Sequence, residues 1–167
     1  LYRYNINDLM QVTGMEQNTP ILKLVQKGVG VSSITGEKLT EEQVHVALRY
    51  AVRQLTLNSV DHFTLAVQMQ LPPRYVGYVE VKEDLSQSVL EEFARIFDQS
   101  LQHQNIEYKD KRATRRLGSP IIEVVKNGTF VKLRQMRVEQ GAPEAQVKIP
   151  FLAGAGFRDT LLALEPG

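Results

Sequence analysis

The chain has 167 residues, of which 43% are hydrophobic and 23% are charged, a composition typical of a globular domain. Twenty Lys and Arg against nineteen Asp and Glu give a formal charge of +1, which argues against a nucleic-acid-binding protein with a dominant basic field. Cysteine is absent, which excludes a disulfide framework, cysteine-ligated zinc and a thiol nucleophile. No apolar run approaches the roughly 18 residues of a membrane span, and no signal segment opens the chain, so we expect a cytoplasmic protein without membrane contact.

The first residues have the rhythm of a β-strand. The chain begins with Leu1-Tyr2-Arg3-Tyr4 and has no initiator methionine, so we expect either that a segment was removed or that this is a piece of a larger protein. Two β-leaning runs follow, over residues 8–14 and 21–27, and the turn-forming residues between them predict a β-hairpin.

The clearest predicted element is a helix that begins after Thr40. The run Thr40-Glu41-Glu42-Gln43 has the spacing of a capping box, and the apolar residues behind it recur at helical spacing. An alternating strand over residues 64–71 follows, in which we expect Leu65 and Ala66 to face opposite sides. Prolines 72 and 73 stop that strand, and residues 75–82 are predicted to form its antiparallel partner.

The second half of the chain predicts two further helices and one strand. A helix is expected from about Asp84 to Gln102, then a polar stretch over residues 105–119 and a short strand over residues 120–125. A third helix starts near Gly128 and ends at Gly141, and the tail is expected to be irregular. From residue 29 this order predicts an α+β fold, a ferredoxin-like split βαβ sheet flanked by helices and preceded by the β-hairpin.

Few residues have the pattern of a catalytic or metal site. His45, His62 and His103 are dispersed, belong to no nucleophile motif and are too far apart for metal-ligand spacing, so we expect no protein-ligated metal. Gly28-Val29-Gly30 is only a fragment of a phosphate-binding loop, and a tight bend between two strands is the better interpretation.

A basic run over residues 109–116 leaves two interpretations open. Its cations are Lys109, Lys111, Arg112, Arg115 and Arg116. RNA binding on a ferredoxin-like sheet also requires aromatic stacking residues in a Lys/Arg-Gly-Phe/Tyr pattern, which no strand here has. A solvated face, or a surface toward another domain, is therefore favoured, and a stand-alone module that binds RNA or protein through this run is the alternative.

Asp8 stands at the start of the predicted hairpin, behind aromatic and basic residues. A carboxylate in such a place can accept hydrogen bonds from vicinal hydroxyls, as carboxylates do with ribose. The ordinary alternative is a turn aspartate that accepts from nearby backbone amides.

The opening of the chain has the pattern Tyr2-Arg3-Tyr4-(x)3-Asp8-(x)3-Val12-Thr13-Gly14-(x)3-Asn18-(x)-Pro20. Four later segments are also distinctive; they are Gly36-Glu37-Lys38-Leu39-Thr40-Glu41, Arg116-Leu117-Gly118, Val124-Val125-(x)2-Gly128-Thr129-Phe130 and Gln146-Val147-Lys148-Ile149-Pro150. These five segments, in this order, resemble motifs of the auxin-responsive Gretchen Hagen family of acyl acid–amido synthetases, adenylate-forming enzymes related to firefly luciferase. The resemblance spans about residues 1–150.

The resemblance implies a division into two parts and a two-step reaction. Residues 1–28 would be a hinge-proximal β-hairpin segment and residues 29–167 a C-terminal lid domain, with an N-terminal adenylating domain as their partner. A carboxylic acid would react with ATP to give an acyl-adenylate, and an amino acid amine would then displace AMP to form an amide. ATP and Mg²⁺ are the implied cofactors, and the chain by itself is expected to be inactive.

The same resemblance implies roles for five residues. Asp8 would contact the ribose hydroxyls, with Tyr2 and Arg3 in the same nucleotide-binding motif. Lys38 would lie near the nucleotide phosphates, and rotation of the lid would bring Lys148 to the α-phosphate. Lysine ammonium groups stabilise the negative charge that develops during adenylation. Without the resemblance, either lysine is interpreted as solvated surface.

The chain departs from the plant members of the family at four places. They are Asn7 in place of Gly, Met15 in place of Phe, Lys27-Gly28 in place of an Arg pair, and Phe151 in place of Arg. These departures indicate a distant, bacterial-type branch and leave the acyl acid and the amine acceptor open. A catalytically inactive member that keeps only the fold is a third interpretation.

Overall fold

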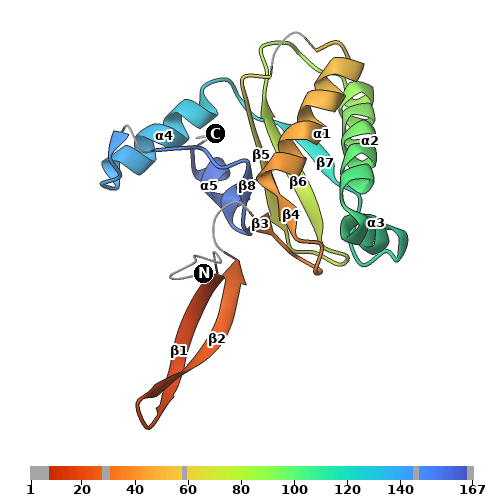
Figure 1. Cartoon of the computed structure of the whole chain (residues 1–167). Coiled ribbons are helices and arrows are strands. Elements are labelled where there is room, and N and C mark those ends of the chain that lie inside the picture. Colours follow the sequence, from red (N-terminus) through yellow and green to blue (C-terminus); the bar gives the residue numbers. More distant parts are fainter. Residues whose placement is uncertain (1–7, 28–30, 58–59, 145–146, 165–167) are drawn as a thin grey trace.

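The computed structural model describes residues 8–27, 31–57, 60–144 and 147–164 (Figure 1). Its elements in chain order are β1 (Asp8–Glu16), β2 (Thr19–Lys27), β3 (Val31–Ser32), β4 (Leu39–Thr40), α1 (Glu41–Gln54), β5 (His62–Gln68), β6 (Arg74–Glu80), α2 (Gln87–Gln104), α3 (Ile106–Ala113), β7 (Ile121–Val124), α4 (Thr129–Glu139), β8 (Leu152–Ala153) and α5 (Phe157–Leu164).

The central element is a four-stranded mixed sheet with the strand order β7-β6-β5-β8. β5 and β6 form the predicted antiparallel hairpin, in which His62 lies opposite Glu80. β7 runs parallel to β6, so β6, α2 and β7 form a parallel βαβ connection, and β8 runs parallel to β5. The predicted α+β class, with a small sheet flanked by helices, is confirmed.

The strand before α1 lies outside this sheet. β3 pairs antiparallel with β4, with Val31 opposite Thr40. The edge of the sheet beside β5 is occupied by β8, where the N–H of Leu65 donates to the carbonyl oxygen of Phe151 at 2.8 Å. A segment from the end of the chain therefore takes the position next to β5, and the strand order differs in this detail from the split βαβ order.

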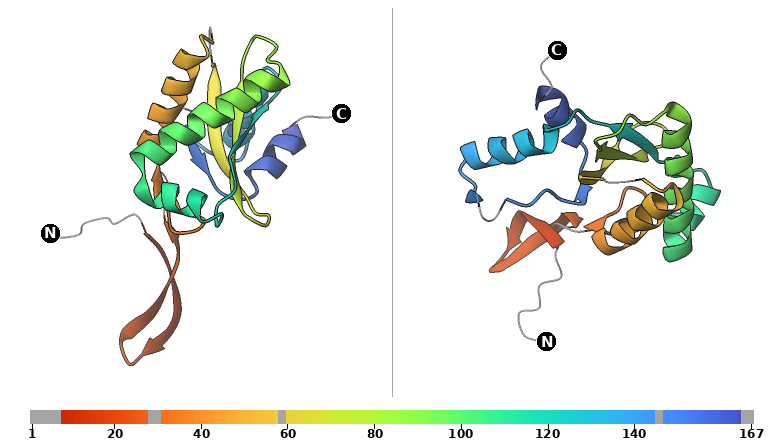
Figure 2. Two further views of the ribbon diagram at one scale, coloured as in Figure 1. Left: turned by 90° about the vertical axis from the view of Figure 1, so that its right-hand side faces the viewer. Right: turned by 90° about the horizontal axis from the view of Figure 1, so that it is seen from above.

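Helices cover both faces of the sheet (Figure 2). α1 and α2 pack on one face around a core that includes Leu65 and Tyr75. α4 and α5 pack on the other face around a core that includes Ala66, Phe130 and Phe157. Leu65 and Ala66 face opposite sides as predicted, but both are buried because the second face has a helical cover of its own.

The predicted capping box at the start of α1 is present. The hydroxyl oxygen of Thr40 accepts from the N–H of Gln43 at 3.3 Å, and the side-chain oxygen of Gln43 accepts from the N–H of Thr40 at 3.1 Å. This reciprocal pair fixes the residue at which the helix begins. It thereby places Lys38 just before the N-terminus of α1 and Glu41 in its first turn.

Two elements of the second half depart from expectation. The polar stretch contains α3, which begins where the side-chain oxygen of Asn105 accepts from the N–H of Tyr108 at 2.9 Å. The expectation of an irregular tail was wrong, because the tail contains β8 and α5. Tyr108 is the buried residue of α3, so this short helix has no apolar stripe that periodicity could reveal.

The predicted N-terminal hairpin is also present and extends away from the sheet and its helices (Figure 1). β1 and β2 are antiparallel, and Gln17 in the turn between them has a φ of 54°. Large apolar side chains are exposed along both strands; they are Met10, Val12, Met15, Ile21 and Leu22. An exposed apolar surface of this kind is typical of a region that packs against another protein or another domain.

Candidate functional site

The structure describes three of the five site residues that the sequence predicts, and they lie in three different segments. Lys38 lies in the loop between β3 and β4, and Lys148 lies in the extended segment before β8. Asp8 is the first residue of β1. Tyr2 and Arg3 lie outside the described residues.

Lys38 is exposed between two buried neighbours. Glu37 and Leu39 are each 0% exposed, whereas the Lys38 side chain lies in solvent. The backbone of Lys38 is left-handed, with a φ of 45°. For a residue with a Cβ this conformation costs about 1–2 kcal/mol. The surrounding structure therefore holds Lys38 in a conformation that the residue does not favour by itself.

Glu37 anchors the loop that carries Lys38. Its carboxylate accepts hydrogen bonds from the N–H groups of Ile34 and Thr35, both at 2.8 Å, from the Thr35 hydroxyl at 3.0 Å and from the Tyr75 hydroxyl. Burial by itself raises the pKa of Glu37, but the hydrogen bonds from Tyr75 and from backbone N–H groups outweigh it and lower the pKa. Burial, together with the charge of Glu37, raises the pKa of Tyr75. The pair is therefore a carboxylate and a neutral phenol at neutral pH.

Phe151 holds the end of the Lys148 segment against α1. Its backbone N–H donates to the carboxylate of Glu41 at 3.2 Å. Its ring stacks on His45 of α1, with the ring centroids 5.2 Å apart. His45 thus packs against the Lys148 segment from the side of α1.

Two more hydrogen bonds fix the backbone of the Lys148 segment. The Thr64 hydroxyl on β5 donates to the carbonyl oxygen of Pro150 at 2.9 Å. The guanidinium of Arg137 on α4 donates to the carbonyl oxygen of Lys148 at 3.3 Å. Elements from both faces of the sheet therefore hold this segment, while the Lys148 side chain is exposed.

The hydrogen bond between Glu41 and Phe151 ties the end of the Lys148 segment to the first turn of α1, which follows the loop of Lys38. Lys38 precedes Glu41 by three residues, and Lys148 precedes Phe151 by three residues. Within the described residues, neither ammonium group has a hydrogen-bond or ion-pair partner. Exposed ammonium groups can donate to an anion such as a phosphate.

The motif Arg116-Leu117-Gly118 has a structural role. Leu117 is fully buried, and its carbonyl oxygen accepts from the guanidinium of Arg112 at 2.9 Å. The N–H of Gly118 donates to the carbonyl oxygen of Pro73 at 2.7 Å, and a Cβ at Gly118 would lie 3.3 Å from the Cβ of Arg74. This close approach explains the glycine without any ligand.

The motif that ends in Gly128-Thr129-Phe130 forms the start of α4. Gly128 is the N-cap and has a φ of 85°. The carboxylate of Glu80, at the end of β6, accepts from the N–H of Gly128 at 2.7 Å and from the N–H of Phe130 at 3.1 Å. Glu80 supplies from a distant strand the cap that no side chain at position 128 can provide.

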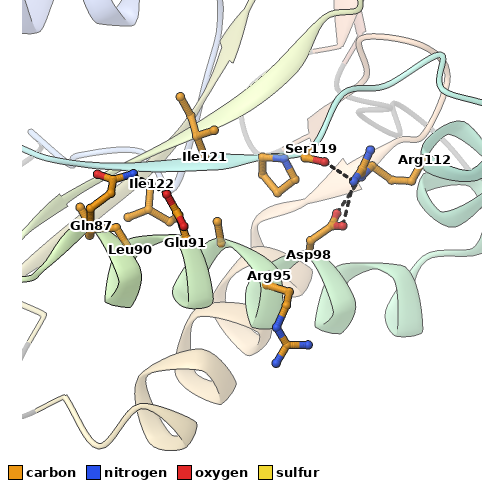
Figure 3. A pocket seen from close by; sticks show the side chains of 11 residues that line it. Gln87, Leu90, Glu91, Arg95, Asp98, Arg112, Ser119, Ile121 and Ile122 are labelled. Carbon is orange, nitrogen blue, oxygen red and sulfur yellow. Dashed lines mark hydrogen bonds and ion pairs between the residues drawn. The ribbon is translucent and has the colours of Figure 1, made fainter.

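The basic run lies on α3 and just beyond it, and one of its members is engaged in the core. Arg112 donates to the Asp98 carboxylate at 2.9 and 3.1 Å and to the hydroxyl of Ser119 at 2.7 Å (Figure 3). The Tyr108 hydroxyl donates to the same carboxylate at 2.7 Å. A shallow cavity of about 410 Å³ lies beside this network, between α2 and β7.

The sheet offers no face on which bases could stack. Its aromatic residues Phe63, Tyr75 and Tyr78 are each less than 5% exposed, because helices cover both faces. Sheet-based RNA recognition requires exposed aromatic rings. The structure therefore gives the nucleic-acid alternative no support beyond the exposed cations of the basic run.

The described residues contain neither a metal-binding cluster nor a membrane-spanning helix. No group of three or more His, Asp or Glu lies in a position to hold a metal ion there. In the same part of the chain, no helix has both the length and the apolar character that crossing a lipid bilayer requires.

Comparisons with known proteins relate the chain to a family. A family model described as the GH3 family C-terminal domain matches residues 42–155. Jasmonoyl–L-amino acid synthetase JAR4 of Nicotiana attenuata is 30% identical over 92% of this chain and 27% of its own length. The 4-substituted benzoates–glutamate ligase GH3.12 of Arabidopsis thaliana is 32% identical over 93% of this chain and 29% of its own length.

A solved structure gives the same result. The GH3.15 acyl acid amido synthetase superposes with a TM-score of 0.71 at 28% identity, over 98% of this chain and 31% of its own. The chain thus spans about a quarter of the length of the curated relatives that it matches. Because the family model covers more than half of the residues, the chain belongs to the GH3 (Gretchen Hagen) family and contains the C-terminal domain of these acyl acid–amido synthetases.

Proposed function

We propose that the protein to which this chain belongs is an ATP-dependent acyl acid–amido synthetase, and that residues 29–167 form its C-terminal lid domain. In the proposed reaction, a carboxylate oxygen of the acyl acid attacks the α-phosphorus of ATP, and pyrophosphate leaves. The amine of an amino acid then attacks the acyl carbon and displaces AMP, which forms the amide. Membership of the GH3 family and the names of its relatives support this reaction class.

The observation that carries the proposal is the hydrogen bond from Phe151 to Glu41, which ties the segment that follows Lys148 to the first turn of α1, three residues after Lys38. Three separate elements hold the backbone of the Lys148 segment, and its ammonium group has no partner among the residues that the structure describes. We assign Lys148 to the α-phosphate during adenylation and Lys38 to the other phosphates. Positive charge at these positions stabilises the negative charge that develops as pyrophosphate leaves.

The chemistry of the described residues fits the phosphates of a nucleotide. Lys38 and Lys148, which have no partner in the described part of the chain, suit phosphate oxygens, which accept hydrogen bonds from ammonium groups. Mg²⁺ is usually bound through substrate phosphates with few protein ligands. Mg²⁺ would supply charge neutralisation on the phosphates. Asp8, Tyr2 and Arg3 are proposed for the ribose end of the nucleotide.

The hairpin is proposed as the segment next to the hinge, over residues 1–28, with an N-terminal adenylating domain as its partner. Its exposed apolar side chains support this assignment, since a two-stranded hairpin alone is only marginally stable in water. Rotation of residues 29–167 about this segment would bring Lys148 to the nucleotide for the first step and remove it for the second.

ATP–pyrophosphate exchange in the full-length protein tests the lysine assignments. The Lys148→Ala and Lys38→Ala variants should each lose about 10²- to 10³-fold in exchange rate, the usual effect of removing one group that stabilises transition-state charge. Lys132→Ala is the matched control, because Lys132 is an exposed lysine on α4, and it should keep the full rate. The 167-residue chain alone should show no exchange.

The lid role is tested by separating the two steps. Lys148→Ala should form amide from a supplied acyl-adenylate at the unaltered rate, because Lys148 acts in the first step only. Equal loss in both steps would contradict the alternation. Unchanged exchange in the Lys148→Ala protein, or exchange by the isolated chain, would contradict the proposed division of labour.

A further inference from the structure

We infer that Glu37 is a positioning residue for Lys38, and that Glu37, Tyr75 and Asn105 together fix the backbone from which Lys38 reaches the nucleotide. This inference rests on the proposed function of Lys38. It gives these three buried polar residues a role in the reaction, although their side chains lie on the inner side of the loop and Lys38 lies on the outer, solvent-exposed side.

The Glu37 carboxylate determines the shape of the loop. It accepts four hydrogen bonds, three of them from Ile34 and Thr35 in the same loop, and it is fully buried. Among the described residues it has no ion-pair partner, so these hydrogen bonds compensate its desolvation. The loop backbone must therefore keep the arrangement in which the N–H groups of residues 34 and 35 point to the carboxylate.

Asn105 fixes the peptide group between Glu37 and Lys38. Its side-chain N–H donates to the carbonyl oxygen of Glu37 at 2.8 Å, and its side-chain oxygen caps α3 at the N–H of Tyr108. Because a peptide group is planar, fixing this carbonyl also fixes the backbone nitrogen of Lys38. The junction of α2 and α3 thereby fixes the peptide group before Lys38, and the pairing of Leu39 with Ser32 in the β3–β4 pair holds the residue after it.

Tyr75 connects the loop to the central sheet. The residue lies on β6, is fully buried, and its hydroxyl donates to the Glu37 carboxylate. The same hydroxyl lies 3.1 Å from the hydroxyl of Ser32 on β3. Tyr75 thus sets the position of the Lys38 loop relative to β5 and β6, which also hold the Lys148 segment through Thr64.

A pair of tyrosine variants in the full-length protein tests the inference. Tyr75→Phe removes the bond to Glu37, and Tyr108→Phe is the matched control, because Tyr108 is an equally buried tyrosine whose hydroxyl donates to Asp98. Both variants should have a lower thermal midpoint. Only Tyr75→Phe should also lower kcat for ATP–pyrophosphate exchange, by about tenfold or more, as expected when a catalytic group is displaced by a fraction of an ångström to one ångström.

A double-mutant cycle separates positioning from general destabilisation. In the Lys38→Ala background, Tyr75→Phe should cause no further loss of exchange, because the residue that it positions is gone. Equal losses in the two tyrosine variants, or a full additional loss in the Lys38→Ala background, would overturn the inference. If Lys38→Ala itself leaves exchange unchanged, the assignment of Lys38 has failed first, and this outcome is distinct from failure of the positioning role.

Discussion

The carboxylate of Glu41 accepts a hydrogen bond at 3.2 Å from the backbone N–H of Phe151, a residue 110 positions later in the chain. Glu41 lies in the first turn of α1, beside the loop of Lys38, and Phe151 closes the segment of Lys148. One side chain therefore relates the two segments that we assign to the nucleotide phosphates. Glu42, its neighbour in the same turn, is exposed and makes no comparable bond within the described residues.

Replacing Glu41 should release the Lys148 segment. We expect Glu41→Ala to lower the free energy of unfolding by about 1–3 kcal/mol, the usual contribution of a hydrogen bond to a charged group. Trypsin should also cleave faster after Lys148 in this variant. Glu42→Ala is the control, because it removes the same charge from the same helical turn. Equal cleavage rates in the two variants would show that Glu41 does not hold the segment.

Gly128 should be sensitive to substitution because of its backbone alone. Its φ is +85°, and a Cβ there would meet nothing within 4 Å. We expect Gly128→Ala to lower the free energy of unfolding by about 1–2 kcal/mol, the cost of a left-handed residue with a Cβ. Gly154 also has open space around it but lacks a left-handed φ, so Gly154→Ala should change stability by less than about 0.5 kcal/mol. Urea unfolding of both variants measures the difference.

The elements that sequence predicted well are those specified by neighbouring residues. The capping box at Thr40 and the hairpin of β1 and β2 depend on residues a few positions apart, and both are present. α3 and α5 are eight residues each, and few of their side chains are buried, so periodicity gives little signal for them. Their existence depends on tertiary packing.

The candidate site also contains residues that the sequence predicts and residues that it does not. Lys38 and Lys148 were singled out by resemblance to a family, since an exposed lysine carries no local signal of its function. Glu37 belongs to one of the motifs that carry the resemblance, but a glutamate in a polar loop is expected to be solvated, so the sequence predicts no role for it. Its burial is decided by Tyr75 and Asn105, which lie 38 and 68 positions away. Such partners cannot be read from a single sequence.

The ion pair between Arg112 and Asp98 should be important for stability, unlike the pair between Arg95 and Glu92 on the outside of α2. The side chains of Arg112 and Asp98 are 16% and 11% exposed, and those of Arg95 and Glu92 are 54% and 43% exposed. Arg112→Ala leaves a buried carboxylate without its cation and should cost about 3–5 kcal/mol. Arg95→Ala should leave the midpoint of urea unfolding unchanged, because exposed pairs contribute little. Similar losses of stability in both variants would contradict the prediction that the buried pair contributes more than the exposed one.

The lowered pKa of Glu37 predicts how stability depends on pH. Hydrogen bonds in the folded state hold this pKa below its ordinary value of 4.5, so the folded protein binds the proton more weakly than the unfolded chain does. The stabilisation is therefore complete above pH 4.5 and is lost as the pH falls below that value, through the folded-state pKa.

Unfolding free energies measured between about pH 3 and pH 7 check this prediction. Glu37→Gln should lower stability at neutral pH and should flatten the decline on the acid side, because the titrating group is gone. Tyr75→Phe removes one of the stabilising hydrogen bonds and should have a smaller effect of the same kind. Glu42→Gln should keep the profile of the unaltered protein. An acid decline that persists at full size in Glu37→Gln would show that other carboxylates produce it.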